Sequence, residues 1–337
     1  MLIPTVKPVA SVADLYARKR VSLSKLFRQN YYWTGSGSAA IYLAIKSSGA
    51  KRVAVPAFTC YIVVDAIRKA GAKPIFYDSG IVATLSDVRK ALVEKPDLLI
   101  VAYNFGLVPD SDKQILAVCR NAKVPVLEDC AHAFGFGQNA DFTIYSSGIA
   151  KSVGYYGGFL VSKKPLVLER LPTLRFDKEL MFTIKVLLSQ IMLNRHSYRF
   201  AQKLVKKSID KYPEAKVYAI SRFGKRVVLN QLVRFNQIQK IRSCNFDLVA
   251  AVKSVVRTKK RSNLYLVLQT KKREWLIKQL RLRGVEIQPA KSFFNLGGPK
   301  YTKATRAEKE HLAFSLYRSE EDMGVVADAI KAVERRL

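Results

Sequence analysis

The sequence predicts an α/β fold with a largely parallel sheet, followed by a smaller α+β region. In the first half, short apolar runs alternate with stretches in which apolar residues recur every three or four positions. After Ser162, this alternation gives way to long, basic helical stretches. The chain has 337 residues, of which 49% are hydrophobic, and this is enough apolar material for two cores without disulfides.

Short apolar runs are expected to form strands at residues 52–56, 73–77, 97–103, 124–128, 142–145 and 158–162. Segments with helical periodicity lie between them, at residues 39–47, 61–70, 84–93 and 112–120, and are expected to cover the sheet. Later, a strand is expected at 264–268, a helix at 272–283 and a strand at 285–288. We therefore expect a large domain over residues 1–229 and a small α+β domain over residues 230–337.

The charge of the chain is strongly positive and unevenly distributed. The 58 Lys and Arg residues exceed the 26 Asp and Glu residues, which gives a net charge of +32. Residues 1–162 contain 19 basic and 11 acidic side chains, so the remaining 39 basic and 15 acidic residues give the second half a net charge of +24. This field attracts nucleotide sugars, anionic lipids and nucleic acid alike. No nucleic-acid-binding motif accompanies it, so no specific nucleic acid is predicted.

The cysteines and the N-terminus predict an ordinary cytoplasmic protein. The four cysteines form no C-x-x-C pair, and three histidines cannot complete a zinc signature, so we expect neither disulfides nor a metal site. The first residues lack the basic and apolar segments of a secretory signal, and no apolar run reaches about eighteen residues.

A basic helical segment at residues 178–207 allows two interpretations. Residues 182–193 are mostly apolar, and a cluster of basic residues follows them: Arg195, Arg199, Lys203, Lys206 and Lys207. A helix that packs on the core and exposes its charges explains this pattern. The alternative is a helix that lies in the interface of an anionic membrane, which would place the protein peripherally at the inner face.

Three segments contain candidate functional residues, and the first is Thr-Gly-Ser-Gly-Ser at residues 34–38. It immediately precedes a helical pattern, and its small residues would leave backbone N–H groups accessible at a helix N-terminus, where a phosphate is favoured. The segment matches neither G-x-G-x-x-G nor a P-loop. It fits either a phosphate site or a simple N-cap.

The second segment ends the strand expected at 124–128. Asp129 would then lie at the carboxyl edge of the sheet, where open α/β sheets bind ligands. Its carboxylate could hold a cationic ring nitrogen, and His132 could reach a neighbouring ligand oxygen. Alternatively, Asp129 caps a helix and His132 packs in the core.

The third segment ends the strand expected at 142–145 in a turn of small residues that contains Lys151. A lysine in a partly desolvated, cationic site has a lowered pKa and can attack a carbonyl to form a Schiff base. On position alone, a solvated surface lysine is the simpler interpretation.

Together these segments resemble the DegT/DnrJ/EryC1/StrS family of pyridoxal-phosphate sugar aminotransferases, which have the aspartate aminotransferase fold, known as fold type I. The family typically has S-G-T-x-A-L, P-A-F-T-F/W, H-x-x-G, E-D-A-A-Q/H, S-F-x-x-x-K and G-E-G-G in this order. The matching segments here are residues 36–41, 56–60, 103–106, 128–132, 146–151 and 156–158. The resemblance therefore covers the first half of the chain in six motifs.

The resemblance implies roles for individual residues. Lys151 would hold pyridoxal phosphate as a Schiff base and move a proton, Asp129 would keep the pyridine nitrogen protonated, and His132 would contact the ring or its O3′. The phosphate would be bound by residues at the first and third segments, namely Ser36, Gly37, Ser38 and Ser146. Cys60 stands at the position of the usual ring-stacking aromatic, so either Cys60 packs on the ring or Tyr61 takes over this contact. Tyr103 and Tyr156 replace the usual histidine and glutamate.

The resemblance also implies an activity. A homodimer would transfer an amino group, from L-glutamate, to a keto sugar linked to a nucleotide, in polysaccharide or amino-sugar biosynthesis. One alternative is a catalytically idle member that acts as a basic regulatory protein on nucleic acid or membrane. Another is a different pyridoxal-phosphate reaction such as sugar dehydration, although the dehydratase relatives carry histidine at the position of Lys151.

Overall fold

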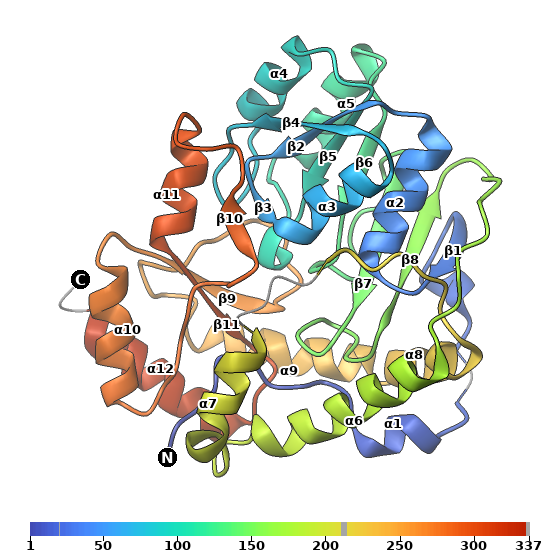
Figure 1. The fold of residues 1–337 in the computed structure, drawn as a ribbon. Coiled ribbons are helices and arrows are strands. Elements are labelled where there is room, and N and C mark those ends of the chain that lie inside the picture. Colours follow the sequence, from blue (N-terminus) through green and yellow to red (C-terminus); the bar gives the residue numbers. More distant parts are fainter. Residues whose placement is uncertain (20, 210–213, 335–337) are drawn as a thin grey trace.

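The computed structural model describes residues 1–19, 21–209 and 214–334, and it is built around a seven-stranded sheet (Figure 1). The strand order is β1-β8-β7-β6-β5-β2-β4. The strands are β1 (Asn30–Thr34), β2 (Arg52–Pro56), β4 (Lys73–Tyr77), β5 (Leu98–Ala102), β6 (Val126–Asp129), β7 (Phe142–Ser147) and β8 (Gly157–Ser162). The six strands expected in this half are confirmed. The strand β1 was not predicted, and its aromatic residues lie immediately before the Gly-Ser segment.

The sheet is largely parallel, as expected. Strands β4, β2, β5, β6 and β7 run parallel to one another, whereas β8 pairs antiparallel with both β7 and β1. The carboxyl ends of β6 and β7 consequently lie side by side. This arrangement brings Asp129 and the turn that contains Lys151 to the same edge of the sheet.

Helices cover both faces of the sheet, and each face has its own core. On one face, α2 (Gly37–Ser48) and α3 (Tyr61–Lys69) pack Ile41 and Ile67 against strand residues such as Val55 and Ile144. On the other face, α4 (Leu85–Val93) and α5 (Asp112–Asn121) pack with Leu99 and Phe159. The three- and four-residue spacing in these helices follows from this one-sided burial.

The C-terminal part has a separate core. Strands β9 (Tyr265–Gln269) and β11 (His311–Ser315) pair antiparallel, and α10 (Arg273–Leu282) and α12 (Glu320–Glu334) pack beside them. Ile3 from the N-terminus joins this core. The helix α9 (Phe235–Asp247) runs from the large core, where Phe235 is buried, toward the small one, where Phe246 packs. The division of the chain at residue 230 stays a prediction.

The strand expected at 285–288 is wrong. Val285 forms an isolated bridge with Ile3, and Gln288 forms another with Ala313. The segment therefore passes between two different partners and pairs with each at one residue only. A short two-stranded sheet that was not predicted, formed by β3 (Phe58–Cys60) and β10 (Phe293–Asn295), joins the two parts of the protein, and α11 (Thr302–Glu310) follows β10.

The basic segment forms two helices, α6 (Phe176–Met192) and α7 (Tyr198–Ile209). In the view of Figure 1, α6 lies with α1 (Val12–Tyr16) and α8 (Arg222–Leu232) below the large sheet, and α7 lies below β11. Lys206 and Lys207, which the sequence places in the basic cluster, lie outside the residues whose side chains are described. Among the described helices, none is both long enough and apolar enough to cross a bilayer.

Candidate active site

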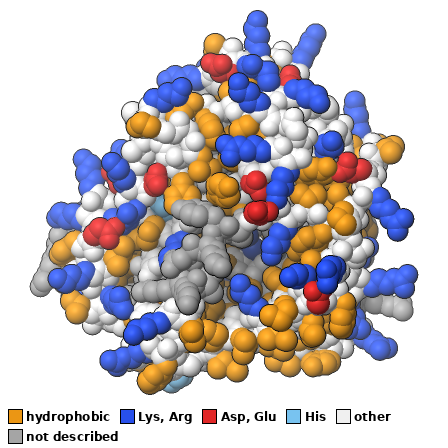
Figure 2. All heavy atoms as spheres, viewed as in Figure 1, with side chains coloured by type: hydrophobic (Ala, Val, Ile, Leu, Met, Phe, Trp, Pro, Cys, Tyr) orange, Lys and Arg blue, Asp and Glu red, His pale blue; other side chains and the backbone are white. Residues whose placement is uncertain are grey.

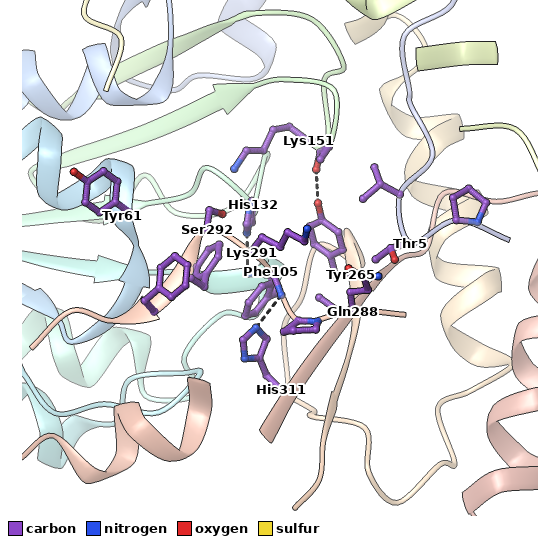
Figure 3. Close-up of a pocket in the computed structure, with 18 of the residues that line it drawn as sticks. Thr5, Tyr61, Phe105, His132, Lys151, Tyr265, Gln288, Lys291, Ser292 and His311 are labelled. Atoms are coloured by element: carbon purple, nitrogen blue, oxygen red, sulfur yellow. Dashed lines mark hydrogen bonds between the residues drawn. The ribbon is translucent and has the colours of Figure 1, made fainter. Parts of the chain in front are cut away.

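A cavity of about 980 Å³ lies between the carboxyl edge of the large sheet and the C-terminal part (Figure 3). Four regions of the chain line it, and the first is the N-terminal segment with Pro4, Thr5 and Val6. Lys151, His132, Phe105 and Tyr61 come from the large sheet and its loops; Tyr265, Lys291, Ser292, Phe293 and His311 come from the C-terminal part; and Lys185, Leu193, Tyr198 and Val205 come from α6 and α7 or the turn between them. The cavity thus contains residues that are far apart in the sequence.

Lys151 lies in the tight turn after β7, and its side chain lines the cavity. Its backbone N–H donates to the carbonyl oxygen of Gly148 at 2.9 Å, which closes the turn. Burial lowers the pKa of Lys151, while the thiol of Cys60 and the carboxylate of Asp129 counteract part of this effect. The structure therefore does not support the interpretation of Lys151 as a solvated surface lysine. The amine is held in an environment that favours its neutral, nucleophilic form.

Asp129 ends β6 and is 8% exposed. Burial raises the pKa of its carboxyl group, and a hydrogen bond from the N–H of Ala131, at 3.0 Å, together with the charge of Lys151 acts in the opposite direction. Both interpretations of this residue thus apply in part, because Asp129 orders the following turn and also lies close enough to Lys151 to interact with it. A buried carboxylate with incomplete compensation is suited to a further cationic partner.

His132 is 7% exposed and contacts the aromatic rings of Phe105, Tyr265 and Phe293, with ring centroids 5.5–5.9 Å apart. Its Nδ1 accepts a hydrogen bond from the N–H of Phe105 at 3.0 Å. Burial and the nearby Lys151 hold the pKa of His132 well below its usual range. The imidazole is therefore neutral with its proton on Nε2, which leaves one donor for a ligand in the cavity.

The residues expected to bind a phosphate come together at the start of α2. Ser36 is the N-cap of this helix, and its hydroxyl accepts from the N–H of Ala39 at 3.0 Å. The hydroxyls of Ser36 and Ser38 lie 2.9 Å apart, and both also donate to the carbonyl oxygen of Lys216. A Cβ atom on Gly37 would lie 2.7 Å from the Cβ of Ser146. The phosphate and N-cap interpretations are compatible, since the N-terminal N–H groups of α2 lie against β7.

Cys60 and Tyr61, the two candidates for a ring contact, lie at the junction of β3 and α3. Cys60 is close enough to Lys151 for the two to influence each other's pKa, although burial dominates and raises the pKa of the Cys60 thiol. Tyr61 lines the cavity, but Figure 3 shows it well to one side of the Lys151 side chain. Cys60 interacts electrostatically with both Lys151 and Asp129.

The two tyrosines that replace usual family residues are engaged elsewhere. The hydroxyl of Tyr103 donates to the buried carboxylate of Glu128 at 2.8 Å, and Thr143 donates to the other oxygen of that carboxylate. The hydroxyl of Tyr156 donates to the carboxylate of Glu179 on α6 and interacts with Ser221. Both tyrosines thus stabilise the scaffold behind the site, and Tyr156 ties the turn after Lys151 to α6.

Several residues that line the cavity were not predicted from the sequence. Tyr265 donates from its hydroxyl to the carbonyl oxygen of Ala150 at 2.7 Å, directly before Lys151. Four basic residues also line the cavity: Lys185, Arg273, Lys291 and Lys309. Their positions among 58 basic residues carry no distinguishing pattern. Only the net charge of the second half indicated that an anion-binding surface lies there.

Comparison with known proteins shows similarities in sequence and in fold. Residues 26–175 match the model of the DegT/DnrJ/EryC1/StrS aminotransferase family. A pleiotropic regulatory protein of Geobacillus stearothermophilus is 30% identical over 156 residues, which cover 42% of each chain. GDP-perosamine synthase of Escherichia coli O157:H7 is 32% identical over 106 residues, which cover 30% of this chain and 29% of that enzyme. The chain thus matches less than half the length of these curated relatives.

Solved structures are similar over nearly the whole chain. A Streptococcus pneumoniae protein described as a sugar aminotransferase, in its PMP form, has a TM-score of 0.71 at 18% identity, covering 100% of this chain and 98% of that one. An aminotransferase from Streptoalloteichus hindustanus has a TM-score of 0.70 at 16% identity, covering 98% of both chains. At such identities the likeness shows the fold. The chain therefore has the fold of these solved aminotransferases, and its residues 26–175 match the model of the DegT/DnrJ/EryC1/StrS aminotransferase family.

Proposed function

We propose that this protein is a pyridoxal-phosphate-dependent aminotransferase that transfers an amino group from L-glutamate to a keto sugar carried on a nucleotide. The observation that carries the proposal is the position of Lys151, which lines the cavity with a lowered pKa and interacts with Asp129 and His132. A lysine, a buried carboxylate and a helix N-terminus at one edge of a sheet fit the three chemical groups of this coenzyme.

The fit to the coenzyme depends on three groups of residues. The backbone N–H groups of Gly37 and Ser38 and the hydroxyl of Ser146 would hold its phosphate. Asp129 would hold the ring nitrogen through a charge-assisted hydrogen bond, and this partner would supply the positive charge that the buried carboxylate needs. The Nε2 proton of His132 would bind an oxygen of the ring. When bound, pyridoxal phosphate supplies a carbonyl carbon and an electron-withdrawing ring.

Lys151 has two tasks in this proposal. Because burial lowers its pKa, a larger fraction of the amine is neutral near pH 7 and can act as a nucleophile at Nζ. The same Nζ would move a proton from the carbon of the amino donor to C4′ of the coenzyme, and it would carry out the reverse transfer to the carbon of the sugar. The hydrogen bond of Tyr265 to Ala150 and the closed turn at Gly148 fix the backbone from which this side chain extends.

The cavity suits an anionic substrate. Lys185, Arg273, Lys291 and Lys309 line it together with the carboxylate of Glu308, so cations predominate. The diphosphate of a nucleotide sugar complements such a lining. Two matched relatives support this class of substrate by name, GDP-perosamine synthase and a UDP-N-acetyl-3-dehydro-α-D-glucosamine 3-aminotransferase from Acidithiobacillus ferrooxidans. We further expect a homodimer that works in the cytoplasm, in polysaccharide or amino-sugar biosynthesis.

The first test is the visible absorption spectrum of the purified protein with pyridoxal phosphate, before and after L-glutamate is added. We expect a yellow band that L-glutamate bleaches in the wild type and that is absent in Lys151→Ala. Lys164→Ala, an exposed lysine beyond β8, is the matched control and should behave like the wild type.

A wild type without the band would contradict the enzyme proposal. The alternative of a basic regulatory protein would then be tested next. The name of the Geobacillus stearothermophilus relative and the basic surface favour this alternative. A band that forms but does not respond to L-glutamate would keep the coenzyme and exclude this donor. In that case other amino donors and a dehydration reaction are the next to be measured.

A further inference from the structure

The outer face of α6 exposes a continuous stripe of apolar side chains. Phe176 is 78% exposed, Met181 63% and Ile191 65%, and Leu180, Ile184 and Leu188 are also exposed on this helix. Figure 2 shows hydrophobic side chains gathered along the lower edge of the molecule, where Figure 1 places α6. An apolar stripe of this length on the surface marks a site of interaction.

The stripe is not needed for packing within the chain, because the inner face of α6 already supplies that contact. Val186 is buried, and Phe182 packs edge-on against Tyr155 and Tyr156 at centroid distances of 5.4 Å. The helix is therefore apolar on both sides. A helix that is apolar all round is typically covered on its second side by a partner or a membrane.

The neighbouring helix α7 continues this surface. Phe200 is 86% exposed and Leu204 65% exposed, while Tyr198 and Val205 are buried on the opposite side. Arg199 and Lys203, on the same helix, are exposed. We call the exposed apolar and basic residues of α6 and α7 the α6–α7 surface.

Charge decides between the two classes of occupant. Lys178, Arg199 and Lys203 are exposed on these helices, whereas the exposed Lys185 lines the cavity. The acidic residues of α6 are engaged, because Asp177 pairs with Arg175 at 3.1 Å and Glu179 accepts from Tyr156. A two-fold interface between copies would bring these cations together and would be repulsive. Anionic headgroups would complement them, while the apolar side chains would enter the boundary of the acyl chains.

We infer that the α6–α7 surface docks the protein onto an anionic lipid bilayer. This inference does not rest on the proposed function, because it follows from exposure and charge alone. It does have a consequence for the cavity, since Lys185, Leu193, Tyr198 and Val205 also line it. The same two helices thus form a wall of the cavity and the membrane-docking surface, so docking brings the cavity to the lipid surface.

The experiment is co-sedimentation of the full chain with unilamellar vesicles. We expect binding to vesicles that contain phosphatidylglycerol and phosphatidylcholine, little binding to phosphatidylcholine alone, and loss of binding as salt is raised. A double variant, Met181→Asp with Ile191→Asp, should bind at least about tenfold more weakly. The pair Arg199→Ser and Lys203→Ser should weaken binding to the anionic vesicles by a similar factor.

Matched controls use residues of the same type elsewhere. Val93 and Leu282 are 77% and 72% exposed on α4 and α10, so Val93→Asp with Leu282→Asp should bind like the wild type. Arg89→Ser with Lys90→Ser, on the exposed side of α4, is the control for charge. Circular dichroism melting checks that each variant is folded. If the Met181→Asp, Ile191→Asp variant does not fold, Phe200→Ser on α7 serves as a second apolar variant.

Two results would overturn the inference. One is a wild type that does not bind phosphatidylglycerol vesicles, and the other is a folded Met181→Asp, Ile191→Asp variant that binds as the wild type does. Sedimentation velocity separates the rival explanation: a dimer that these substitutions dissociate, without vesicle binding, would assign the surface to a second copy. The coenzyme spectrum is measured separately, so a failure here leaves the proposed function standing.

Discussion

The hydroxyl of Tyr265 donates a hydrogen bond to the carbonyl oxygen of Ala150, and this 2.7 Å contact joins β9 of the C-terminal part to the residue before Lys151. The two residues are 115 positions apart in the sequence. The contact fixes the turn that carries the proposed nucleophile from the opposite wall of the cavity. The C-terminal part therefore positions the site as well as lining it.

Tyr265→Phe removes this contact and keeps the ring. We expect the free energy of unfolding to fall by about 1 kcal/mol, and kcat to fall by about tenfold because the Lys151 turn loses a support. Urea denaturation and steady-state kinetics measure the two effects. Tyr77→Phe is the matched control, since the buried hydroxyl of Tyr77 donates to the carbonyl oxygen of Ile100 at 2.9 Å, away from the cavity. Equal losses of kcat in both variants would contradict a positioning role for Tyr265.

Asp129→Asn keeps the size of the side chain and removes its charge. The proposed partner is a ring nitrogen that must stay protonated, so we expect kcat to fall by about 100-fold or more while the Kd for pyridoxal phosphate changes little. Rapid kinetics and fluorescence titration of the coenzyme distinguish the two quantities. Asp141→Asn is the control, because Asp141 accepts from the N–H of Val126 at the other end of β6. An Asp129→Asn enzyme with normal kcat would exclude this role.

Gly37→Ala tests the phosphate cradle. The added Cβ would lie 2.7 Å from the Cβ of Ser146, so either α2 or β7 must shift at the point where the phosphate is proposed to bind. We expect the Kd for pyridoxal phosphate to rise by about tenfold, which corresponds to the usual cost of overpacking. Equilibrium dialysis of the coenzyme provides the measurement. At Gly80 an added Cβ would meet no atom within 4 Å, so Gly80→Ala should leave the Kd unchanged.

His311 makes the stability of the protein depend on pH. Its Nε2 accepts from the N–H of Ala290 at 3.0 Å, so Nδ1 carries the proton and donates to the carbonyl oxygen of Ala307. Burial lowers the pKa of His311 from 6.5 to about 4. Below pH 6.5 the unfolded chain binds a proton that the folded chain does not, so stability is lost as the pH falls toward 4.

The expected loss from His311 between pH 6.5 and pH 4 is about 3 kcal/mol in the free energy of unfolding. Urea denaturation at a series of pH values measures it. In His311→Asn, the pH dependence of the free energy of unfolding over this range should correspond to about one proton fewer taken up on unfolding than in the wild type. An unchanged slope in His311→Asn would show that His311 is protonated in the folded protein.

The sequence by itself determined the large sheet and the identity of the residues at its edge. In the sequence, buried parallel strands are apolar runs, and in their covering helices apolar residues recur every three or four positions. The reason is that each element buries its apolar residues in a regular pattern. Asp129, His132 and Lys151 were likewise identifiable, since motif order and spacing along the chain are local properties. The expected strand at 285–288 failed because single bridges to Ile3 and Ala313 leave the same short apolar pattern as a strand.

Only the tertiary structure decided what surrounds Lys151. Burial lowers the pKa of its amine, and residues of the C-terminal part, α6 and α7 line the same cavity. No sequence pattern indicates contacts between residues so far apart. The same holds for α6. Its apolar residues predict a helix, but the inner contacts of Phe182 and Val186 had to be located before Met181 and Ile191 could be recognised as an exposed surface. Periodicity specifies which residues share a face, whereas the packing of distant segments determines which face is buried.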